Sequence, residues 1–409
     1  MKYAKWILLA LLLPVMNLKS QPYIINLNTL AANAASSSFN QIKPGDTVWL
    51  QAGNRDFLRI SNFHGSADHP IVFANLNGPV IVQSTNSYGI AFSNCSFFKL
   101  AGLPGPGYAY GIIVKNVPVT SGVGISADQR STNLEFEKCE VANTGFAGIM
   151  AKTDPVCGDP TTYRNGFTQY NTVIHDCYVH DVGGEGMYIG HSSYNGLSLD
   201  GCTELVLPSV LDGVAIYHNK IERSGWDGIQ VSSAVRNCCI HHNLLINCST
   251  SMTPKQMSGI MIGGGTLAEC YNNAIIDCYS TGIVVLGKGG TIVYNNLIVR
   301  PAKKYEPDDM EKHEGGIFLG YRSSEDKTFF GIYNNTIIQP KSDGIRIDAL
   351  VDFPVQIYNN AIIDPGAYDF YKNGSNGLTG AEAFVFNAST PSIMDSAHNF
   401  FSRSASSPG

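Results

Sequence analysis

The sequence is poor in charged residues and shows no helical periodicity. Charged residues make up 15% of the 409 residues and hydrophobic residues make up 44%. In the long middle part of the chain, apolar residues do not recur every 3.6 positions, and leucine does not recur at the spacing of leucine-rich repeats. These absences argue against helical and leucine-rich solenoids.

Long apolar runs are also lacking, apart from one at the start. Lys2 and Lys5 precede an apolar run from Trp6 to Val15, and Ser20 is a small residue at which a signal peptidase could cut. The run is shorter than the roughly 20 residues of a membrane span. We therefore expect residues 1–20 to be a signal peptide, cleaved near Ser20, and the protein to be secreted, extracellular or periplasmic, with no membrane span.

A basic surface is lacking as well. The formal net charge is −6, and loss of the signal peptide removes three lysines and no acids, which changes the charge to −9. Nucleic-acid-binding domains are usually basic. We therefore expect no nucleic-acid partner.

The dominant feature that is present is a repeated block. An aromatic residue or His is followed by Asn-Asn or His-Asn at residues 217–219, 241–243, 271–273, 294–296, 333–335 and 358–360. Gly-Ile or Gly-Met pairs begin at positions 148, 186, 228, 259, 282, 316 and 344. The last Asn of successive blocks recurs after 24, 30, 23, 39 and 25 residues, so a unit of about two dozen residues carries loops of varying length. Such a period is typical of a solenoid.

Each unit has room for three short strands and for no helix. Segments such as TIVYNN, LIVR and GIFLG are rich in Ile, Val and Tyr and are interrupted by Gly, Asn and Pro. Three strands of about seven residues fill the shortest unit, so stacked coils would form three parallel sheets around one apolar core. Asn tolerates left-handed backbone angles. We therefore expect the Asn at a tight bend, with side-chain amides bonded from coil to coil in an asparagine ladder.

The repeat predicts one continuous domain and a monomer. Residues 43–365 would form the stack, behind an N-terminal cap at residues 21–42. Within that cap, residues 27–42 can form a short amphipathic helix that covers the first coil, because the ends of a solenoid need covering. Residues 366–409 lose the repeat and are expected to be a polar C-terminal segment or cap.

Ten cysteines in an exported chain suggest disulfides, but we expect most of them to be free. Stacked residues of neighbouring coils lie about 4.8 Å apart, whereas the Cβ atoms of a disulfide lie nearer about 3.8 Å. Cys139 and Cys177 align with the ladder Asn and should be buried thiols. Cys157 and Cys202 lie in long insertions at the same corner of adjacent coils, and this pair is the best candidate for a disulfide.

The repeat, together with the opening segments PGDTVWLQAG and HPIVFANLNGPVIV, resembles right-handed parallel β-helix proteins of the pectate-lyase-like class. The resemblance covers roughly residues 40–365. It implies an all-β, single-stranded parallel β-helix with the ladder between sheets two and three. By analogy, TIVY-type segments belong to sheet two, LIVR-type segments to sheet three and GIVVL-type segments to sheet one. Members of the class usually hold substrate beside sheet one.

Strand alternation predicts which residues face outward from sheet one. The second residue after each Gly should point out, which gives the column Met150, Tyr188, Gln230, Met261, Val284, Phe318 and Arg346. Glu185 and Asp227 stand just before the Gly in adjacent coils. Two carboxyl groups about 5 to 9 Å apart can act as acid and base in glycoside hydrolysis, since repulsion raises one pKa. We therefore propose a catalytic role for this pair.

The same region offers substrate-binding side chains. Trp226 could stack on a sugar, and the candidate polar contacts are Tyr188, His191, Gln230 and Arg223. The insertions at residues 152–170 and 191–212 would wall the groove on one side. The alternatives for the two acids are a structural role, because acids before a turn Gly commonly bond the turn's own amides, and metal binding.

A second candidate site is the loop at residues 301–315. Asp308, Asp309 and Glu314 are weak candidates for binding Ca²⁺, because hard oxygen ligands suit it. Lysines interspersed among these acids favour a solvated charged loop instead. Arg346 could bind an acidic sugar nearby.

Three functions remain open at this point. The first is a secreted enzyme that cleaves an extracellular, acidic or neutral polysaccharide, as a lyase or a glycoside hydrolase. The second is a non-catalytic, adhesive surface protein that binds glycans, and the third is a sugar epimerase. Because the Asn-Thr-Asp and Gly-His-Gly motifs of polygalacturonase-like hydrolases and the Asp-Pro-His motif of alginate epimerases are absent, the enzyme hypothesis depends on the clustered site.

Overall fold

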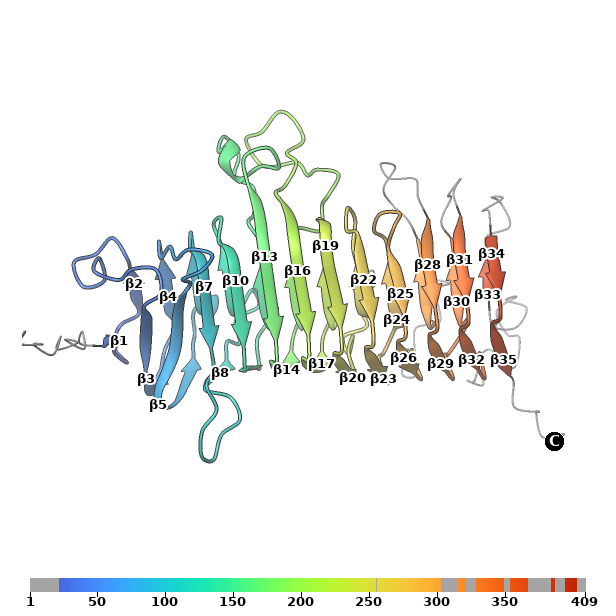
Figure 1. Cartoon of the computed structure of the whole chain (residues 1–409), viewed down its shortest axis with the longest axis horizontal. Helices are drawn as coiled ribbons and strands as arrows, with labels where there is room; N and C mark the ends of the chain where they lie inside the picture. The colour runs from blue at the N-terminus through green and yellow to red at the C-terminus, as the bar shows by residue number, and fades with distance from the viewer. Residues whose placement is uncertain are drawn as a thin grey trace, which may run out of the picture.

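The protein is an elongated stack of parallel strands (Figure 1). The computed structural model describes residues 22–254, 256–302, 315–320, 329–348, 354–366, 384–386 and 394–402. The helical element in these ranges is one short 3₁₀ turn at Pro160–Thr162. No helix in the described ranges has the length and hydropathy of a membrane span.

Sheet one has twelve parallel strands, built from the Gly-Ile segments. They are β2 Ala31–Asn33, β4 Leu58–Ser61, β6 Tyr88–Ser93, β9 Val123–Asp128, β12 Ile149–Ala151, β15 Met187–Ile189, β18 Ile229–Val231, β21 Ser258–Ile262, β24 Thr281–Val285, β27 Ile317–Leu319, β30 Ile345–Ile347 and β33 Phe384–Phe386.

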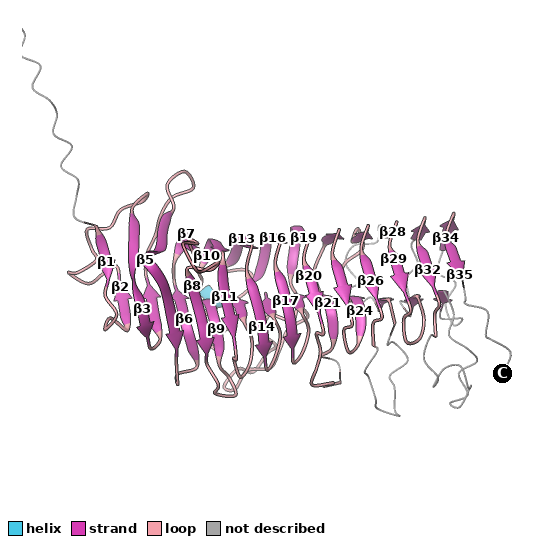
Figure 2. Cartoon of the chain, turned by 90° about the horizontal axis from the view of Figure 1, so that it is seen from below, coloured by secondary structure: helices cyan, strands magenta, loops and turns pink. Residues whose placement is uncertain are grey.

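Sheets two and three are joined near the N-terminus and separate later. The long strands β3 Thr47–Arg55 and β5 Ile71–Gln83 run through both, so that β5 pairs with β7 in sheet two and β8 in sheet three. Sheet two also holds β1 Tyr23–Ile25, β7 Ser96–Ala101, β10 Thr132–Glu137, β13 Thr168–His175, β16 Val210–Tyr217, β19 Ala234–His241, β22 Ala268–Tyr271, β25 Ile292–Tyr294, β28 Phe330–Tyr333, β31 Val355–Tyr358 and β34 Met394–Ala397. Figure 2 shows the strands of sheet three side by side, seen from below. They are β8 Ile112–Asn116, β11 Cys139–Ala142, β14 Tyr178–Val182, β17 Lys220–Ser224, β20 Leu244–Ile246, β23 Ala274–Ile276, β26 Leu297–Val299, β29 Thr336–Ile338, β32 Ala361–Ile363 and β35 Phe400–Ser402.

One apolar core runs the length of the stack. Alternate residues of all three sheets point inward and are almost fully buried, for example Ile149, Ile174 and Val179 in one coil and the next. The Gly at the start of most sheet-one strands is needed for close approach. A Cβ atom on Gly228 would lie 2.6 Å from Leu245 Cδ2 and 2.7 Å from the carbonyl oxygen of Gly259, so a larger residue would push the coils apart.

The predicted asparagine ladder is confirmed. Asn273 Nδ2 donates to Asn296 Oδ1 at 3.0 Å and to the carbonyl of Ile240 at 2.9 Å, while Asn273 Oδ1 accepts from the backbone N–H of Asn243 at 3.1 Å. The same pattern links Asn219, Asn243, Asn273, Asn296, Asn335, Asn360 and Asn399. The left-handed bend belongs to the preceding residue, such as Asn272 with φ of 54°, so one residue turns the chain and the next bonds the coils.

The predicted N-terminal helix is wrong. Residues 31–33 form strand β2, which pairs with β4, and residues 34–41 form turns. Because β1 pairs with β3, the first coil of the stack starts at Tyr23. Pairing with a neighbouring coil satisfies backbone groups that an isolated helix of this length would leave exposed. At the other end, β33 to β35 and Asn399 add a coil beyond the boundary at residue 365.

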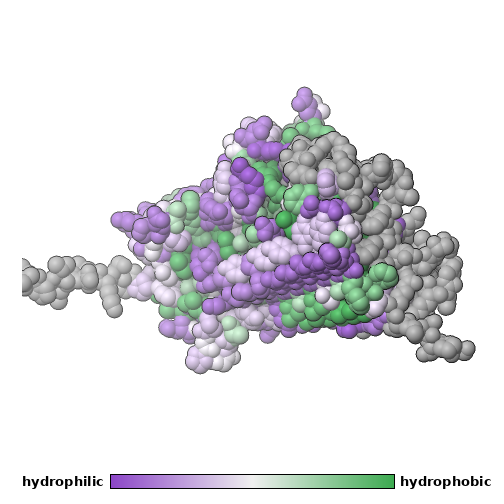
Figure 3. Space-filling model, turned by 45° about the vertical axis from the view of Figure 1, so that its right-hand side comes forward, coloured by the Kyte–Doolittle hydropathy of each residue, from purple (hydrophilic) through white to green (hydrophobic). Residues whose placement is uncertain are grey.

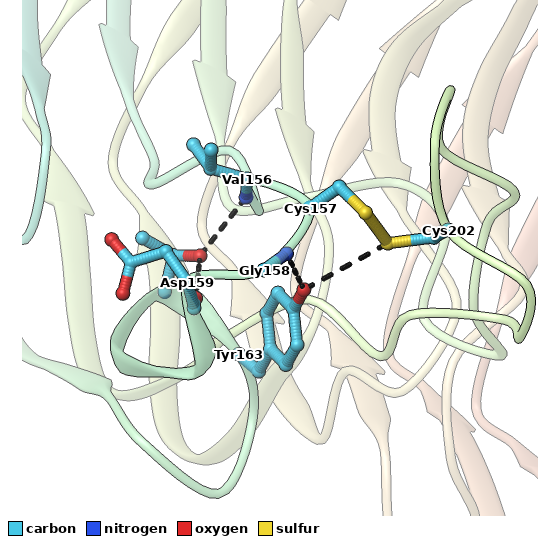
Figure 4. Close-up of a disulfide and its surroundings, with 7 residues drawn as sticks. Val156, Cys157, Gly158, Asp159, Tyr163 and Cys202 are labelled. Carbon is cyan, nitrogen blue, oxygen red and sulfur yellow. Dashed lines mark hydrogen bonds between the residues drawn. A yellow bond between two sulfur atoms is a disulfide. The ribbon is translucent and has the colours of Figure 1, made fainter.

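The cysteines behave as the stacking argument predicts. Cys157 and Cys202 form a disulfide with Cα atoms 5.7 Å apart, and it joins the two long insertions (Figure 4). The other eight cysteines are free, and all but Cys239 are buried. Cys177 occupies the ladder position, where its backbone N–H donates to Asn219 Oδ1 at 3.0 Å.

The outer face of sheet three changes character along the stack. Tyr178, His180 and Glu222 point outward from its earlier strands, whereas the outward residues of β20, β23, β26 and β29 are nearly all aliphatic. In the space-filling view, hydrophilic rows run along the stack and a hydrophobic area lies below them toward the C-terminal end (Figure 3).

Candidate functional site

Glu185 and Asp227 lie at the same position of adjacent coils, as predicted. The backbone N–H of Gly186 donates to the carbonyl of Asp227 at 2.9 Å, and the N–H of Gly148 donates to the carbonyl of Glu185 at 3.0 Å. Both side chains are buried, with 2% of Glu185 and none of Asp227 exposed. The pair is therefore adjacent but does not line the open groove that we expected.

Each of the two buried carboxyl groups has one oxygen without a hydrogen-bond partner. Asp227 Oδ1 accepts from Ser258 Oγ at 2.5 Å, but Asp227 Oδ2 and Glu185 Oε2 have no hydrogen-bond partner. Burial raises the pKa of Glu185 to about 7. Burial, with a smaller contribution from the neighbouring Glu185, raises the pKa of Asp227 to about 8. Both groups therefore hold protons at a pH at which exposed acids are ionised.

Aromatic side chains close the outer face of sheet one around this pair. Phe146 packs edge-on against Trp226, with ring centres 5.5 Å apart, and against Tyr188, with ring centres 6.1 Å apart. Trp226 is half-buried, and Tyr188 packs with Ala147 and Met150 in a small apolar cluster. Phe146 and Trp226 come from the coils on either side of the one that carries Glu185 and Tyr188.

A charged group flanks the aromatic cluster on the insertion side. The ammonium of Lys152 lies 5.1 Å from the ring centre of Tyr188 and forms an ion pair with Asp154. His191 Nε2 lies 3.6 Å from Asp154 Oδ1, and His191 Nδ1 accepts from the backbone N–H of Ser193 at 3.1 Å. Because burial and Lys152 lower the pKa of His191, its ring is neutral, and with Nδ1 occupied as an acceptor it carries its proton on Nε2.

This charged group reaches solvent. The side chain of Asp154 is 61% exposed, and the hydroxyl of Tyr188 is hydrogen-bonded to exposed Ser192 at 3.0 Å. Lys152 and Asp154 begin the first insertion, while His191 and Ser192 begin the second, so the disulfide ties both sides of this opening together. Both insertions therefore begin beside the end of sheet one and are joined by the disulfide.

Two cavities lie near these elements. One of about 380 Å³ is lined by Asp154, Asp128 and Arg130, and it adjoins the charged group directly. A second of about 660 Å³ lies beneath the disulfide and includes Tyr163 and Arg164. Neither cavity is lined by Glu185, Asp227 or Trp226.

Two predicted substrate contacts lie away from the acid pair. Arg223 is at the end of a sheet-three strand, where it binds Asp181 through two hydrogen bonds of 2.6 and 2.8 Å and lines a hollow of about 520 Å³. Arg346 is four coils beyond Gln230 in the sheet-one column and pairs with Asp343 and Asp348. Gln230 itself is next to Tyr188 in register but is buried.

Possible metal ligands occur at two places in the chain. Asp308, Asp309 and Glu314 lie outside the described residues. On the outer face of sheet two, Glu135, Glu137 and His175 place one ligand atom each within 4.8 Å of one another. Lys99 Nζ already lies 2.7 Å from Glu135 and 3.0 Å from Glu137, so an ion-pair network accounts for this group without a metal.

Sequence reasoning missed Lys152 and Asp154. They were assigned only to the wall of the groove, although Lys152 directly follows the sheet-one strand β12. A lysine and an acid two residues apart at the end of a sheet-one strand are the signal that could have identified them.

Comparison with known proteins agrees with the architecture. The model of the family described as right handed beta helix region matches residues 46–203 and 209–393. No curated protein matches the chain in sequence.

Solved structures show the same fold at low identity. A GH136 lacto-N-biosidase from Eubacterium ramulus aligns with a TM-score of 0.63 and 12% identity, covering 94% of this chain and 68% of that one. A PL6 family alginate lyase, AlyGC, aligns with a TM-score of 0.50 and 13% identity, covering 91% of this chain and 51% of that one. At these identities the likeness concerns the fold.

Proposed function

The chain belongs to the right-handed β-helix family, and on this premise we propose that it is a secreted carbohydrate-active enzyme that cleaves a polysaccharide on the outer face of sheet one. The reaction that the site supports best is hydrolysis of a glycosidic bond. Glu185 would be the general acid. The sugar would bind on the side of Tyr188 that faces the two insertions.

The observation that carries this proposal is the burial of the Glu185 carboxyl group. Its carboxyl group has one oxygen without a partner, and burial raises its pKa to about 7. Glycoside hydrolysis requires a carboxylic acid that keeps its proton near neutral pH until it gives it to the leaving oxygen. A purely structural turn acid would be expected to bond the turn's amides with both oxygens.

The neighbouring groups suggest how the remaining roles are divided. Glu185 would protonate the glycosidic oxygen as the bond to the sugar carbon breaks, and the exposed carboxylate of Asp154 would take a proton from the attacking water. Asp227 is fully buried behind Glu185, so we assign it the positioning of Glu185 rather than contact with substrate. Trp226 and Tyr188 offer apolar faces for a sugar ring. Substrate access to Glu185 requires a shift of the aromatic side chains that cover it.

One observation favours lyase chemistry as the second candidate. The ammonium of Lys152 beside the Tyr188 ring could neutralise the carboxylate of a uronate sugar, which is the charge that β-elimination must stabilise. The neutral His191 is poorly placed to be the base, because its Nδ1 already accepts a hydrogen bond. The base would then have to be Tyr188, since Lys152 supplies the positive charge.

Incubation of the mature protein with a panel of neutral and uronate polysaccharides tests both candidates. New reducing ends without unsaturated products are expected for the hydrolase, and unsaturated products would establish the lyase. Asp200→Asn, an exposed acid in the same insertion as His191, is the matched control for Glu185→Gln. Binding of a polysaccharide without either product would contradict both and establish the glycan-binding alternative.

A further inference from the structure

The external corner between sheets two and three carries three histidines where the repeat elsewhere has Asn and Tyr. His218 and His242 occupy the left-handed position that Asn272 and Asn295 occupy in the next coils. His241 occupies the column of ring residues that continues with Tyr271. Three of the ten histidines of the chain are therefore gathered on two adjacent coils. The substitutions are local, since the backbone follows the same path in the neighbouring coils.

The three imidazoles face one another at short range. His241 Nδ1 lies 2.8 Å from His242 Nδ1, so two atoms of the same kind compete for one proton. The ring centres of His241 and His242 are 5.0 Å apart, those of His218 and His242 are 5.4 Å apart, and those of His218 and His241 are 6.4 Å apart. The side chain of His218 is 54% exposed, and its Nδ1 lies 4.0 Å from Asp176 Oδ1.

These separations are close to those around a bound metal ion. An imidazole nitrogen at about 2.1 Å from a metal places the ring centre about 3.2 Å from it, so two ligands in a tetrahedral site have ring centres about 5.2 Å apart. The two separations that involve His242 meet this value closely. The third is about 1 Å too long, and rotation of His218 toward the pair would shorten it.

We propose that His218, His241 and His242 form a binding site for one divalent transition-metal ion of the kind that prefers imidazole ligands, such as Zn²⁺ or Ni²⁺. Both Nδ1 atoms of the close pair would face the ion, and His218 would be the third ligand. Water would complete the coordination at this exposed corner.

The side chain of Asn272 already contacts the far nitrogen of the His242 ring. The side-chain amide nitrogen of Asn272 lies 3.2 Å from His242 Nε2. When His242 binds the ion through Nδ1, its proton moves to Nε2, and rotation of the Asn272 amide presents its oxygen as the acceptor. Metal-bound histidines almost always donate their second N–H to such an oxygen.

The repeat supplies variants that test the site without disturbing the fold. His218→Asn, His242→Asn and His241→Tyr each install the residue found at the same position in later coils. His398→Asn is the matched control, because His398 has the same left-handed backbone, with φ of 55°, near the far end of the stack. Cys239→Ser controls for the one free cysteine that is not fully buried.

Calorimetric titration of the full mature chain with Zn²⁺ and with Ni²⁺ is the test. We expect one site per chain, unchanged in His398→Asn and Cys239→Ser, and at least about tenfold weaker binding in His242→Asn, since loss of even an outer-shell partner costs about 10- to 100-fold. Equal binding in the triple variant and the native chain would overturn the site. So would loss of binding in Cys239→Ser alone, which would assign the ion to the thiol.

Discussion

The asparagine corner and the flank of sheet one are built from the same coils, yet one is uniform and the other changes from coil to coil. The corner repeats Asn from position 219 to position 399. The residues before the sheet-one Gly are instead Ala147, Glu185, Asp227, Ser258, Thr281, Gly315 and Asp343. A corner that fixes the register of every coil allows the opposite edge to change without loss of the fold. The proposed catalytic site therefore lies where the repeat is least constrained.

The largest expected effect is on the rate of polysaccharide cleavage, from a substitution of Glu185 in the variable flank of sheet one. Glu185→Gln keeps the shape but removes the transferable proton, so we expect the rate of polysaccharide cleavage to fall by about 10²- to 10⁴-fold. Thr281→Ser changes the same position three coils later, where no acid is present, and should leave the rate unchanged. Equal rates for Glu185→Gln and the native enzyme would remove the acid from the mechanism.

A substitution in the uniform asparagine corner should lower the stability of the protein rather than its activity. Asn273→Ala leaves the buried N–H of Asn243 and the carbonyl of Ile240 without their partners. We expect the free energy of unfolding to fall by about 3 kcal/mol, measured by denaturant titration. Asn195→Ala, at an exposed position in an insertion, is the control and should change it by less than about 0.5 kcal/mol. A small effect at Asn273 would mean that the ladder does not hold the coils together.

The pH dependence of stability provides a further test of the flank of sheet one. Asp227 has a pKa near 8 in the folded protein and an ordinary, much lower pKa when unfolded. Between these values the unfolded chain binds fewer protons, so stability should fall as the pH rises from about 5 to 9, by on the order of 1 to 3 kcal/mol.

Asp227→Asn should reduce that slope, since it removes one of the two buried acids, Asp227 and Glu185, that must ionise within the protein. Denaturant titrations at about pH 5, 7 and 9 measure it. A slope that is the same in the variant and the native chain would show that Asp227 is ionised in the folded state.

The smallest expected effect concerns the disulfide. Cys157→Ser with Cys202→Ser frees the two insertions that carry Lys152, Asp154 and His191. We expect a loss of activity of roughly tenfold, because misplaced groups reduce the rate even when the chemistry is intact. The free thiols of the core are untouched, so the ladder and the melting of the stack should change less than in Asn273→Ala. Full activity after loss of the disulfide would show that the fixed position of the insertions is not needed for catalysis.

The sequence was sufficient for the architecture because the repeat is local and regular. Gly before each sheet-one strand, Asn at the corner and alternating aliphatic residues each have a single physical explanation, and the structure confirms all three. The disulfide was predictable from the position of Cys157 and Cys202 in insertions on adjacent coils. The N-terminal cap was not predictable, because its apolar pattern suits a short helix as well as a coil that pairs with the next one.

The site was only partly predictable. Register alone placed Glu185 beside Asp227, but their burial and the packing of Phe146 against Trp226 depend on side-chain packing between neighbouring coils. The ion pair between Arg223 and Asp181 likewise depends on side-chain directions at the end of sheet three. Long-range packing of this kind leaves no mark in the spacing of a single sequence.

The most direct test of the central claim is a carboxyl NMR titration of the protein labelled with ¹³C at the side-chain carboxyl carbon of glutamate. Comparison with Glu185→Gln assigns the resonance of Glu185. We expect it to titrate near pH 7, well above the exposed glutamates of the same chain. Titration of Glu185 in the ordinary range near pH 4.5 would show that no proton is held on sheet one, and it would contradict the proposed role of this residue.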